Sequence, residues 1–120
     1  MSGRLNRQAA EDRGRRAETI AAWWLRLQGW RVLATRVRVS GGEVDIIARR
    51  GRVLAFVEVK QRATEEAAAW SLDEFRLRRV AVAAAHLTPR YARNGDDVRI
   101  DALFIVPRRL PRHLPNVWHG

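Results

Sequence analysis

Cysteine is absent from the 120 residues of the chain, which excludes disulfide frameworks, cysteine-ligated zinc and thiol catalysis. No apolar run approaches the ~20 residues that a membrane-spanning helix requires, and the basic N-terminus lacks the apolar segment of a signal peptide. We therefore expect a cytoplasmic protein with no membrane partner. The length predicts one domain over residues 1–120, with one modest hydrophobic core.

Lysine is almost absent too, because Lys60 is the only lysine among the 23 lysine and arginine residues. The basic residues leave a formal net charge of +10 and an isoelectric point near 11.7. Such a charge favours an anionic partner, with a nucleic acid as the first candidate and a membrane surface as the second. The competing interpretation is that the arginines only keep the protein in solution. The histidines lack His-x-x-x-His spacing, and there is no P-loop or G-x-S-x-G elbow.

Two amphipathic segments predict helices on either side of the strand-rich middle of the chain. The first covers about 7–28, is followed by Gly29 as a stop signal, and carries an apolar stripe on Ala17, Ile20, Ala21, Trp24 and Leu27. The second begins in a capping box at 71–74 with Ser71 as the cap. It is expected to end near Leu87, because Thr88 precedes a proline.

The strands complete an α/β fold in the order α-β-β-β-α-β, with a mixed central sheet between helices. Runs rich in β-branched residues predict strands at 30–39, 43–49, 53–61 and 98–106. Residues 1–6 are expected to be disordered, and 107–120 to form a C-terminal loop with a short strand at 116–119.

Three charged residues interrupt strands that are otherwise apolar enough to be buried. Glu58 and Lys60 share one face of their strand, because side chains i and i+2 point the same way. A hairpin brings Asp45 of the preceding strand near Glu58, given a small bend or bulge. An unpaired charge in an apolar interior is costly, so we expect these residues to pair, to hold a metal or to act in catalysis.

The same three residues predict metal-assisted hydrolysis of a phosphodiester. Two adjacent carboxylates repel each other unless a cation neutralises them, and carboxylate oxygens with water suit Mg²⁺ or Mn²⁺. The Val59 carbonyl is a further candidate ligand. A bound metal activates water, and Lys60 would orient that water or offset charge on the phosphate. The alternative is a structural ion pair between Lys60 and Asp45 or Glu58 inside the sheet.

The two strands resemble those of a known family. Gly-Glu-Val-Asp-Ile-Ile-Ala at 42–48 and Phe-Val-Glu-Val-Lys at 56–60 are similar to the YraN-like family, a branch of the PD-(D/E)XK, restriction-endonuclease-like superfamily. That family is also similar to archaeal Holliday-junction resolvases. Segments at 14–18, 29–33, 99–101 and 113–118 resemble the family as well. The resemblance implies a three-layer α-β-α fold and endonuclease-like activity on DNA, with branched or structured DNA as one candidate and a homodimer as an assembly to test.

The resemblance also implies roles for single residues. Asp45 and Glu58 would be metal ligands, Lys60 the catalytic lysine and Glu18 an additional acidic residue; an ion pair with Arg15 is the alternative for Glu18. The chain departs from the family at Arg36-Val37, where Asn-Trp is usual, and has an arginine at 76 where a lysine is expected. Candidate nucleic-acid contacts are Arg15, Arg16, Arg38, Arg62 and Arg76, and candidate supporting residues are Glu43, Gln61 and Asp101.

Three functions stay open on this basis. The first is a metal-dependent endonuclease. The second is a catalytically silent nucleic-acid-binding protein that keeps a nuclease fold. The third is a scaffold protein whose charge serves solubility.

Overall fold

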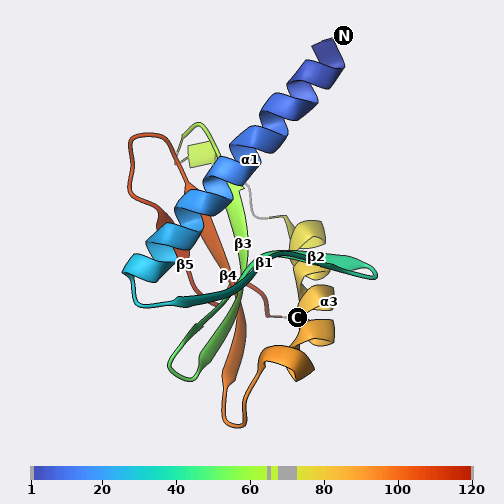
Figure 1. Cartoon of the computed structure of the whole chain (residues 1–120), viewed down its shortest axis with the longest axis vertical. Coiled ribbons are helices and arrows are strands. Elements are labelled where there is room, and N and C mark those ends of the chain that lie inside the picture. The colour runs from blue at the N-terminus through green and yellow to red at the C-terminus, as the bar shows by residue number, and fades with distance from the viewer. Residues whose placement is uncertain (1, 65, 68–72, 120) are drawn as a thin grey trace.

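The computed structural model describes residues 2–64, 66–67 and 73–119. A long helix, three strands, a second helix and two further strands follow one another along the chain (Figure 1). Their bounds are α1 (Ser2–Leu27), β1 (Arg31–Val39), β2 (Gly42–Arg50), β3 (Val53–Gln61), α3 (Glu74–Tyr91), β4 (Asp97–Ile105) and β5 (Arg112–Leu114). The predicted order α-β-β-β-α-β is confirmed, and β5 follows it.

The strands form one mixed sheet in the order β1-β2-β3-β4-β5. β1, β2 and β3 are an antiparallel meander, β4 lies parallel to β3, and β5 is antiparallel to β4. A parallel neighbour requires a crossover connection, which α3 supplies. β3 is thereby the central strand, and its apolar run at 54–57 is buried on both faces because a helix covers each side.

α1 and α3 cover opposite faces of the sheet, each over its own core. α1 crosses one face obliquely, and its N-terminal half extends beyond the strands (Figure 1). α3 packs Leu77, Val80 and Leu87 against the other face, where Phe56 of β3 is fully buried. Within the described residues, no helix combines the length and the apolar character needed to cross a bilayer.

α1 begins at Ser2, earlier than the expected residue 7, so that most of the segment expected to be disordered is helical. It ends in a Schellman motif: the Trp30 N–H donates to the Leu25 carbonyl at 2.9 Å, and Gly29 has a φ of +92°. The predicted apolar stripe was partly wrong, because Ile20 and Leu27 are exposed. The buried ridge is Ala17, Ala21 and Leu25, whose small alanines let the helix approach the sheet closely.

α3 differs from its expected bounds at both ends. Its N-cap is Asp73, whose carboxylate accepts a hydrogen bond from the Phe75 N–H at 2.8 Å; the expected cap, Ser71, lies outside the described residues. The helix continues through Pro89 to Tyr91. Pro89 cannot donate to the carbonyl four residues earlier, but it lies in the last turn, so the loss is confined to the end of the helix, which stops two residues later.

The short C-terminal strand is β5 at Arg112–Leu114, and the expected strand at 116–119 is wrong. Pro115 has no N–H to continue a ladder. Asn116 then turns the backbone with a φ of +55° and donates its N–H to the Asp101 carboxylate at 3.0 Å. The segment returns to β4 in a single backbone hydrogen bond, from the Val117 N–H to the Ile100 carbonyl at 2.8 Å, and forms no strand.

Candidate active site

The candidate site lies where the start of β2 separates from the end of β3. The last paired residues there are Ile46 and Val57, so Asp45 falls beside Glu58 in the sequence register. Instead of continuing the ladder, Asp45 Oδ2 accepts a hydrogen bond from the Val59 N–H at 2.7 Å. The side chain of one strand therefore caps the free backbone of the next, and the two carboxylates come together.

This environment raises the pKa of Asp45 from 3.8 to about 7. Burial is the largest cause and repulsion from Glu58 the next, while the hydrogen bond from Val59 opposes both. Glu18 on α1 adds a smaller repulsion. Acidic residues from α1, β2 and β3 therefore act on one another, and a bound cation would relieve their repulsion.

Glu58 faces α3 and is almost wholly buried, with 1% of its side chain exposed. Its Oε1 accepts a hydrogen bond from Arg76 Nη2 at 2.9 Å and lies 3.4 Å from Lys60 Nζ. Burial lowers the pKa of the Arg76 guanidinium, but attraction to Glu58, Asp45 and Glu43 outweighs it and raises that pKa. In this structure two protein cations thus neutralise Glu58, and Lys60 forms the Glu58 ion pair that was the structural alternative.

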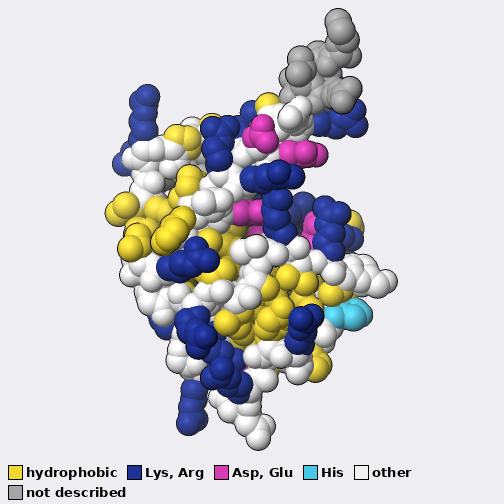
Figure 2. Space-filling model, in the orientation of Figure 1, with side chains coloured by type: hydrophobic (Ala, Val, Ile, Leu, Met, Phe, Trp, Pro, Cys, Tyr) yellow, Lys and Arg dark blue, Asp and Glu magenta, His cyan; other side chains and the backbone are white. Residues whose placement is uncertain are grey.

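A pocket of about 440 Å³ opens beside Asp45 between α1 and the β1–β2 hairpin. Acidic and basic side chains both line it, and Figure 2 shows acidic side chains among Lys and Arg side chains in the upper half of the molecule. The charged lining residues are Glu11, Glu18, Glu43, Asp45, Arg15, Arg36 and Arg38. Such a pocket has carboxylates for a cation and guanidinium groups for phosphate oxygens.

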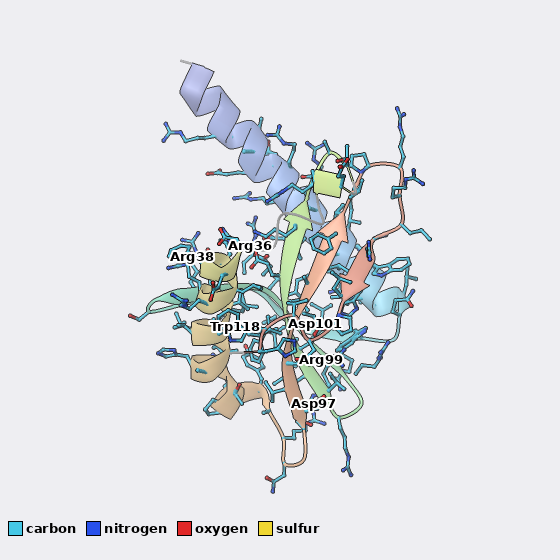
Figure 3. All side chains as sticks on the ribbon, turned by 180° about the vertical axis from the view of Figure 1, so that it is seen from behind. Arg36, Arg38, Asp97, Arg99, Asp101 and Trp118 are labelled. Carbon is cyan, nitrogen blue, oxygen red and sulfur yellow. The ribbon has the colours of Figure 1, made fainter. Side chains whose placement is uncertain are left out.

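Glu18 pairs with Arg36 of β1, whose Nε donates to Glu18 Oε2, and not with Arg15 on its own helix. Arg36 has a φ of +53°, which is uncommon outside glycine. Sequence reasoning did not select Arg36 as a site residue. Its i, i+2 spacing from Arg38 on one strand is the signal that could have indicated it. Figure 3 labels both arginines, which lie close together on β1.

The other candidate arginines on this side have different surroundings. Arg15 lines the pocket from α1, and Arg16 is exposed on the same helix. Arg38 is exposed, and its Nε lies 3.5 Å from Glu43 Oε2. Because exposed pairs of this kind contribute little, Arg38 can exchange its carboxylate for a phosphate at small cost.

Gln61 and Arg62 mark the end of β3. Gln61 is half-buried and pairs with Ile105, and its carbonyl accepts a hydrogen bond from Arg62 Nη1 at 2.6 Å. The Arg62 N–H continues the ladder to the Ile105 carbonyl at 3.1 Å. Neither residue lines the pocket beside Asp45.

Asp101 of β4 is fully buried and belongs to a separate network. Its carboxylate accepts hydrogen bonds from Arg99 Nε at 3.0 Å, the Asn116 N–H at 3.0 Å and His113 Nε2 at 2.7 Å. Burial raises its pKa, but these hydrogen bonds outweigh burial and lower it. Figure 3 places Arg99 and Asp101 along β4, away from Arg36 and Arg38. Asp101 therefore ties the C-terminal segment to the sheet.

The donor set fits a hard divalent cation held by two protein carboxylates. Among the described residues, no group of three acidic or histidine side chains is arranged to hold a metal. Mg²⁺ commonly uses only one or two carboxylates, with waters and substrate phosphates as its other ligands. Asp45 and Glu58 satisfy that requirement, provided that Glu58 exchanges Arg76 for the cation. The Val59 N–H is engaged by Asp45, and the Val59 carbonyl is the part of this residue that could bind a metal.

Comparison with known proteins agrees with the fold and identifies the family. The model of the uncharacterised protein family UPF0102 matches residues 17–105. A UPF0102 protein of Sphingopyxis alaskensis is 59% identical over 114 residues, covering 95% of this chain and 98% of the relative. A UPF0102 protein of Rhizorhabdus wittichii is 58% identical over 117 residues, covering 97% and 99%.

Among solved structures, a Holliday junction resolvase of Archaeoglobus fulgidus is similar in fold. The two superpose with a TM-score of 0.57 at 21% sequence identity, covering 83% of this chain and 73% of the resolvase. This likeness confirms the expected restriction-endonuclease-like arrangement of a mixed sheet between helices. On the family match and the relatives together, the chain is a member of the UPF0102 family, the YraN-like proteins.

Proposed function

We propose that the protein binds DNA and hydrolyses its phosphodiester bonds with Mg²⁺ or Mn²⁺ held by Asp45 and Glu58. The observation that carries the proposal is the convergence of these two carboxylates beside Lys60, with Asp45 also lining a pocket that holds arginines. A net charge of +10 supports an anionic substrate. The resolvase with a similar fold supports branched DNA as the first substrate to test.

Each residue of the candidate site would have its own role in the proposed hydrolysis. A bound metal would polarise a phosphate oxygen and lower the pKa of a water. Lys60, buried and 3.4 Å from Glu58 Oε1, is held where its charge can offset that of the reacting phosphate. Arg36 and Arg38 would bind neighbouring phosphates. Glu18 would keep Arg36 in place through their ion pair, which makes Glu18 a positioning residue.

Cleavage of labelled DNA tests the proposal. A four-way junction, a flap, a duplex and a single strand are incubated with the protein in Mg²⁺ or Mn²⁺, beside Asp45→Asn and Lys60→Ala variants. Cleavage is expected in the wild type, with a loss of about 100-fold or more in either variant. Asp97→Asn, which removes an exposed carboxylate at the start of β4, is the control that should cleave normally. The proposal fails if no substrate is cut, or if Lys60→Ala cuts as fast as wild type.

A second candidate, DNA binding without catalysis, is favoured by one observation. Glu58 is already neutralised by Arg76 and Lys60, so a stable ion-pair cluster could replace the metal altogether. In that case DNA binding would be salt-dependent and unaffected by Asp45→Asn, and Mn²⁺ would not change it. Metal-dependent turnover that is lost in Asp45→Asn rules this candidate out.

A further inference from the structure

Phe75 is an exposed aromatic residue near the candidate site, and the function proposed above gives it no role. Phe75, the second residue of α3, has 65% of its surface exposed. Its chain neighbour Arg76 contacts Glu58. Phe75 borders a groove of about 200 Å³ that is lined by Gly41, Arg78, Arg79 and Val82 as well. The groove therefore borders the same first turns of α3 that carry Arg76 to the acidic site.

The two walls of this groove are in close contact with each other. One wall is the β1–β2 turn and the other is α3, and they meet at Gly42. A Cβ at position 42 would lie 2.4 Å from the Arg79 carbonyl oxygen and 2.8 Å from the Ala83 nitrogen. Only glycine permits this contact between hairpin and helix, and the contact holds the groove at a set width beside Phe75.

Positive charge surrounds the ring. Arg78 is exposed and pairs with Glu74 at 3.4 Å, an exposed i, i+4 pair that gives way readily to another anion. Arg79 has no hydrogen-bond or ion-pair partner in the part of the chain that the structure describes. A flat apolar surface flanked by two guanidinium groups matches a nucleotide, which pairs an aromatic base with an anionic phosphate.

We propose that this groove binds one unstacked base of a DNA strand, with Phe75 as the stacking surface and Arg78 and Arg79 on the flanking phosphates. The inference rests on the proposed function for its DNA ligand and specifies the substrate class: DNA with an unpaired nucleotide next to the scissile region. A base inside an intact duplex has both faces stacked and reaches Phe75 only after unpairing. Because Phe has no hydrogen-bonding group, the groove discriminates unpaired from paired nucleotides without reading base identity.

The test measures binding in EDTA, where no metal-dependent cleavage occurs. One DNA duplex contains a single-stranded gap with 5-iodouracil in the gap, and a matched intact duplex contains it in a base pair. Irradiation is expected to cross-link the gapped DNA to Phe75, located by mass spectrometry, and to leave the duplex uncross-linked there. Cross-linking of wild-type protein does not depend on how any variant folds. A cross-link at other residues alone, or none, overturns the proposal.

Affinities by fluorescence anisotropy give the second arm. Phe75→Ala is expected to weaken binding of gapped DNA by about five- to hundred-fold and to leave binding of the duplex unchanged. Phe75→Trp should restore it. Leu27→Ala is the matched control, since Leu27 is an equally exposed apolar residue at the far end of α1. Equal binding of gapped DNA by Phe75→Ala and wild type, or an equal loss on gapped DNA and duplex, overturns the proposal.

Three further outcomes distinguish the groove proposal from a protein-contact role for Phe75 and from the catalytic proposal. If Phe75→Ala changes the sedimentation coefficient and not the DNA affinity, the ring contacts another protein copy and the proposal is wrong. If gapped DNA binds through Phe75 but is never cut in metal, the groove stands and the catalytic proposal falls. If DNA is cut normally by Phe75→Ala and bound with wild-type affinity, the groove falls and the catalytic proposal stands.

Discussion

The Arg76 guanidinium donates a hydrogen bond to Glu58 Oε1 at 2.9 Å, on the carboxylate that the proposed metal requires. Lys60 approaches the same oxygen to 3.4 Å. Arg76 is 39% exposed, whereas Lys60 is buried, so Arg76 is the cation that is free to leave toward solvent or DNA. A metal bound as proposed would therefore compete with Arg76 for Glu58, and a DNA phosphate that attracted Arg76 would favour the metal.

Replacing Arg76 should accordingly have opposite effects on two ligands. In Arg76→Gln, Mn²⁺ binding to the free protein is expected to tighten about tenfold, because a charge-assisted hydrogen bond of ~1.5 kcal/mol no longer competes. DNA binding in EDTA should weaken, and its salt dependence should fall by about one unit of slope. Calorimetry measures the Mn²⁺ affinity, and fluorescence anisotropy measures the DNA affinity and its salt dependence. Arg31→Gln, which removes an exposed arginine at the start of β1, is the control and should change neither affinity. Weaker Mn²⁺ binding by Arg76→Gln than by wild type would contradict the competition.

The raised pKa of Asp45 predicts a loss of stability with rising pH in metal-free protein. The folded state keeps its proton to about pH 7, whereas the unfolded state releases it near 3.8. Between these values the folded state binds more protons, so stability falls as pH rises through this window. Asp45→Asn should remove that fall, which thermal unfolding in EDTA across the window would measure. Added Mg²⁺ should stabilise the wild type above pH 7 and not the variant. If the stability of wild type and of Asp45→Asn falls equally with rising pH, this prediction is wrong.

Asp96 has the opposite pH dependence. Arg49 donates two hydrogen bonds to its carboxylate, at 3.0 and 2.6 Å, and the Arg93 N–H donates another at 2.6 Å. These contacts lower the pKa of Asp96 to about 2 from 3.8, so it contributes stability above pH 3.8 that is lost as pH falls through 2. Asp96→Asn should be less stable at neutral pH and lose less on acidification, in urea unfolding at each pH. Asp97→Asn, an exposed neighbour, should follow the wild-type curve.

Replacing Gly42 or Gly14 by alanine should change the free energy of unfolding in opposite directions. Gly42→Ala places a Cβ 2.4 Å from the Arg79 carbonyl oxygen, and forcing the hairpin from α3 should cost about 1–3 kcal/mol. Gly14→Ala meets no atom within 4 Å, and inside α1 it should stabilise by about 0.5–1 kcal/mol. Urea unfolding of both variants gives the comparison. Equal effects of the two substitutions would show that the close approach at Gly42 has no energetic consequence.

Local patterns were sufficient for the element order and for part of the site. Alternation along two strands indicated that Asp45, Glu58 and Lys60 were charges at buried positions, and the hairpin register brought Asp45 to Glu58. The same reasoning misplaced features that depend on packing. Ile20 was assigned to the buried face of α1, yet it is exposed, and the face that packs on the sheet carries Ala17, Ala21 and Leu25.

Partner choice was decided by the tertiary structure. Glu18 had a cation three residues away in Arg15, but it pairs with Arg36, eighteen residues along the chain, because α1 crosses over β1. Arg76 was selected from the sequence only as a candidate DNA contact, and α3 places it in a hydrogen bond with Glu58 as well. Spacing along one element determines which face a side chain occupies, whereas the element lying opposite that face depends on how helices cross the sheet. The sequence by itself determined the charged strands, the family and the arginine-rich surface; the packing of α1 and α3 decided which cation each carboxylate meets.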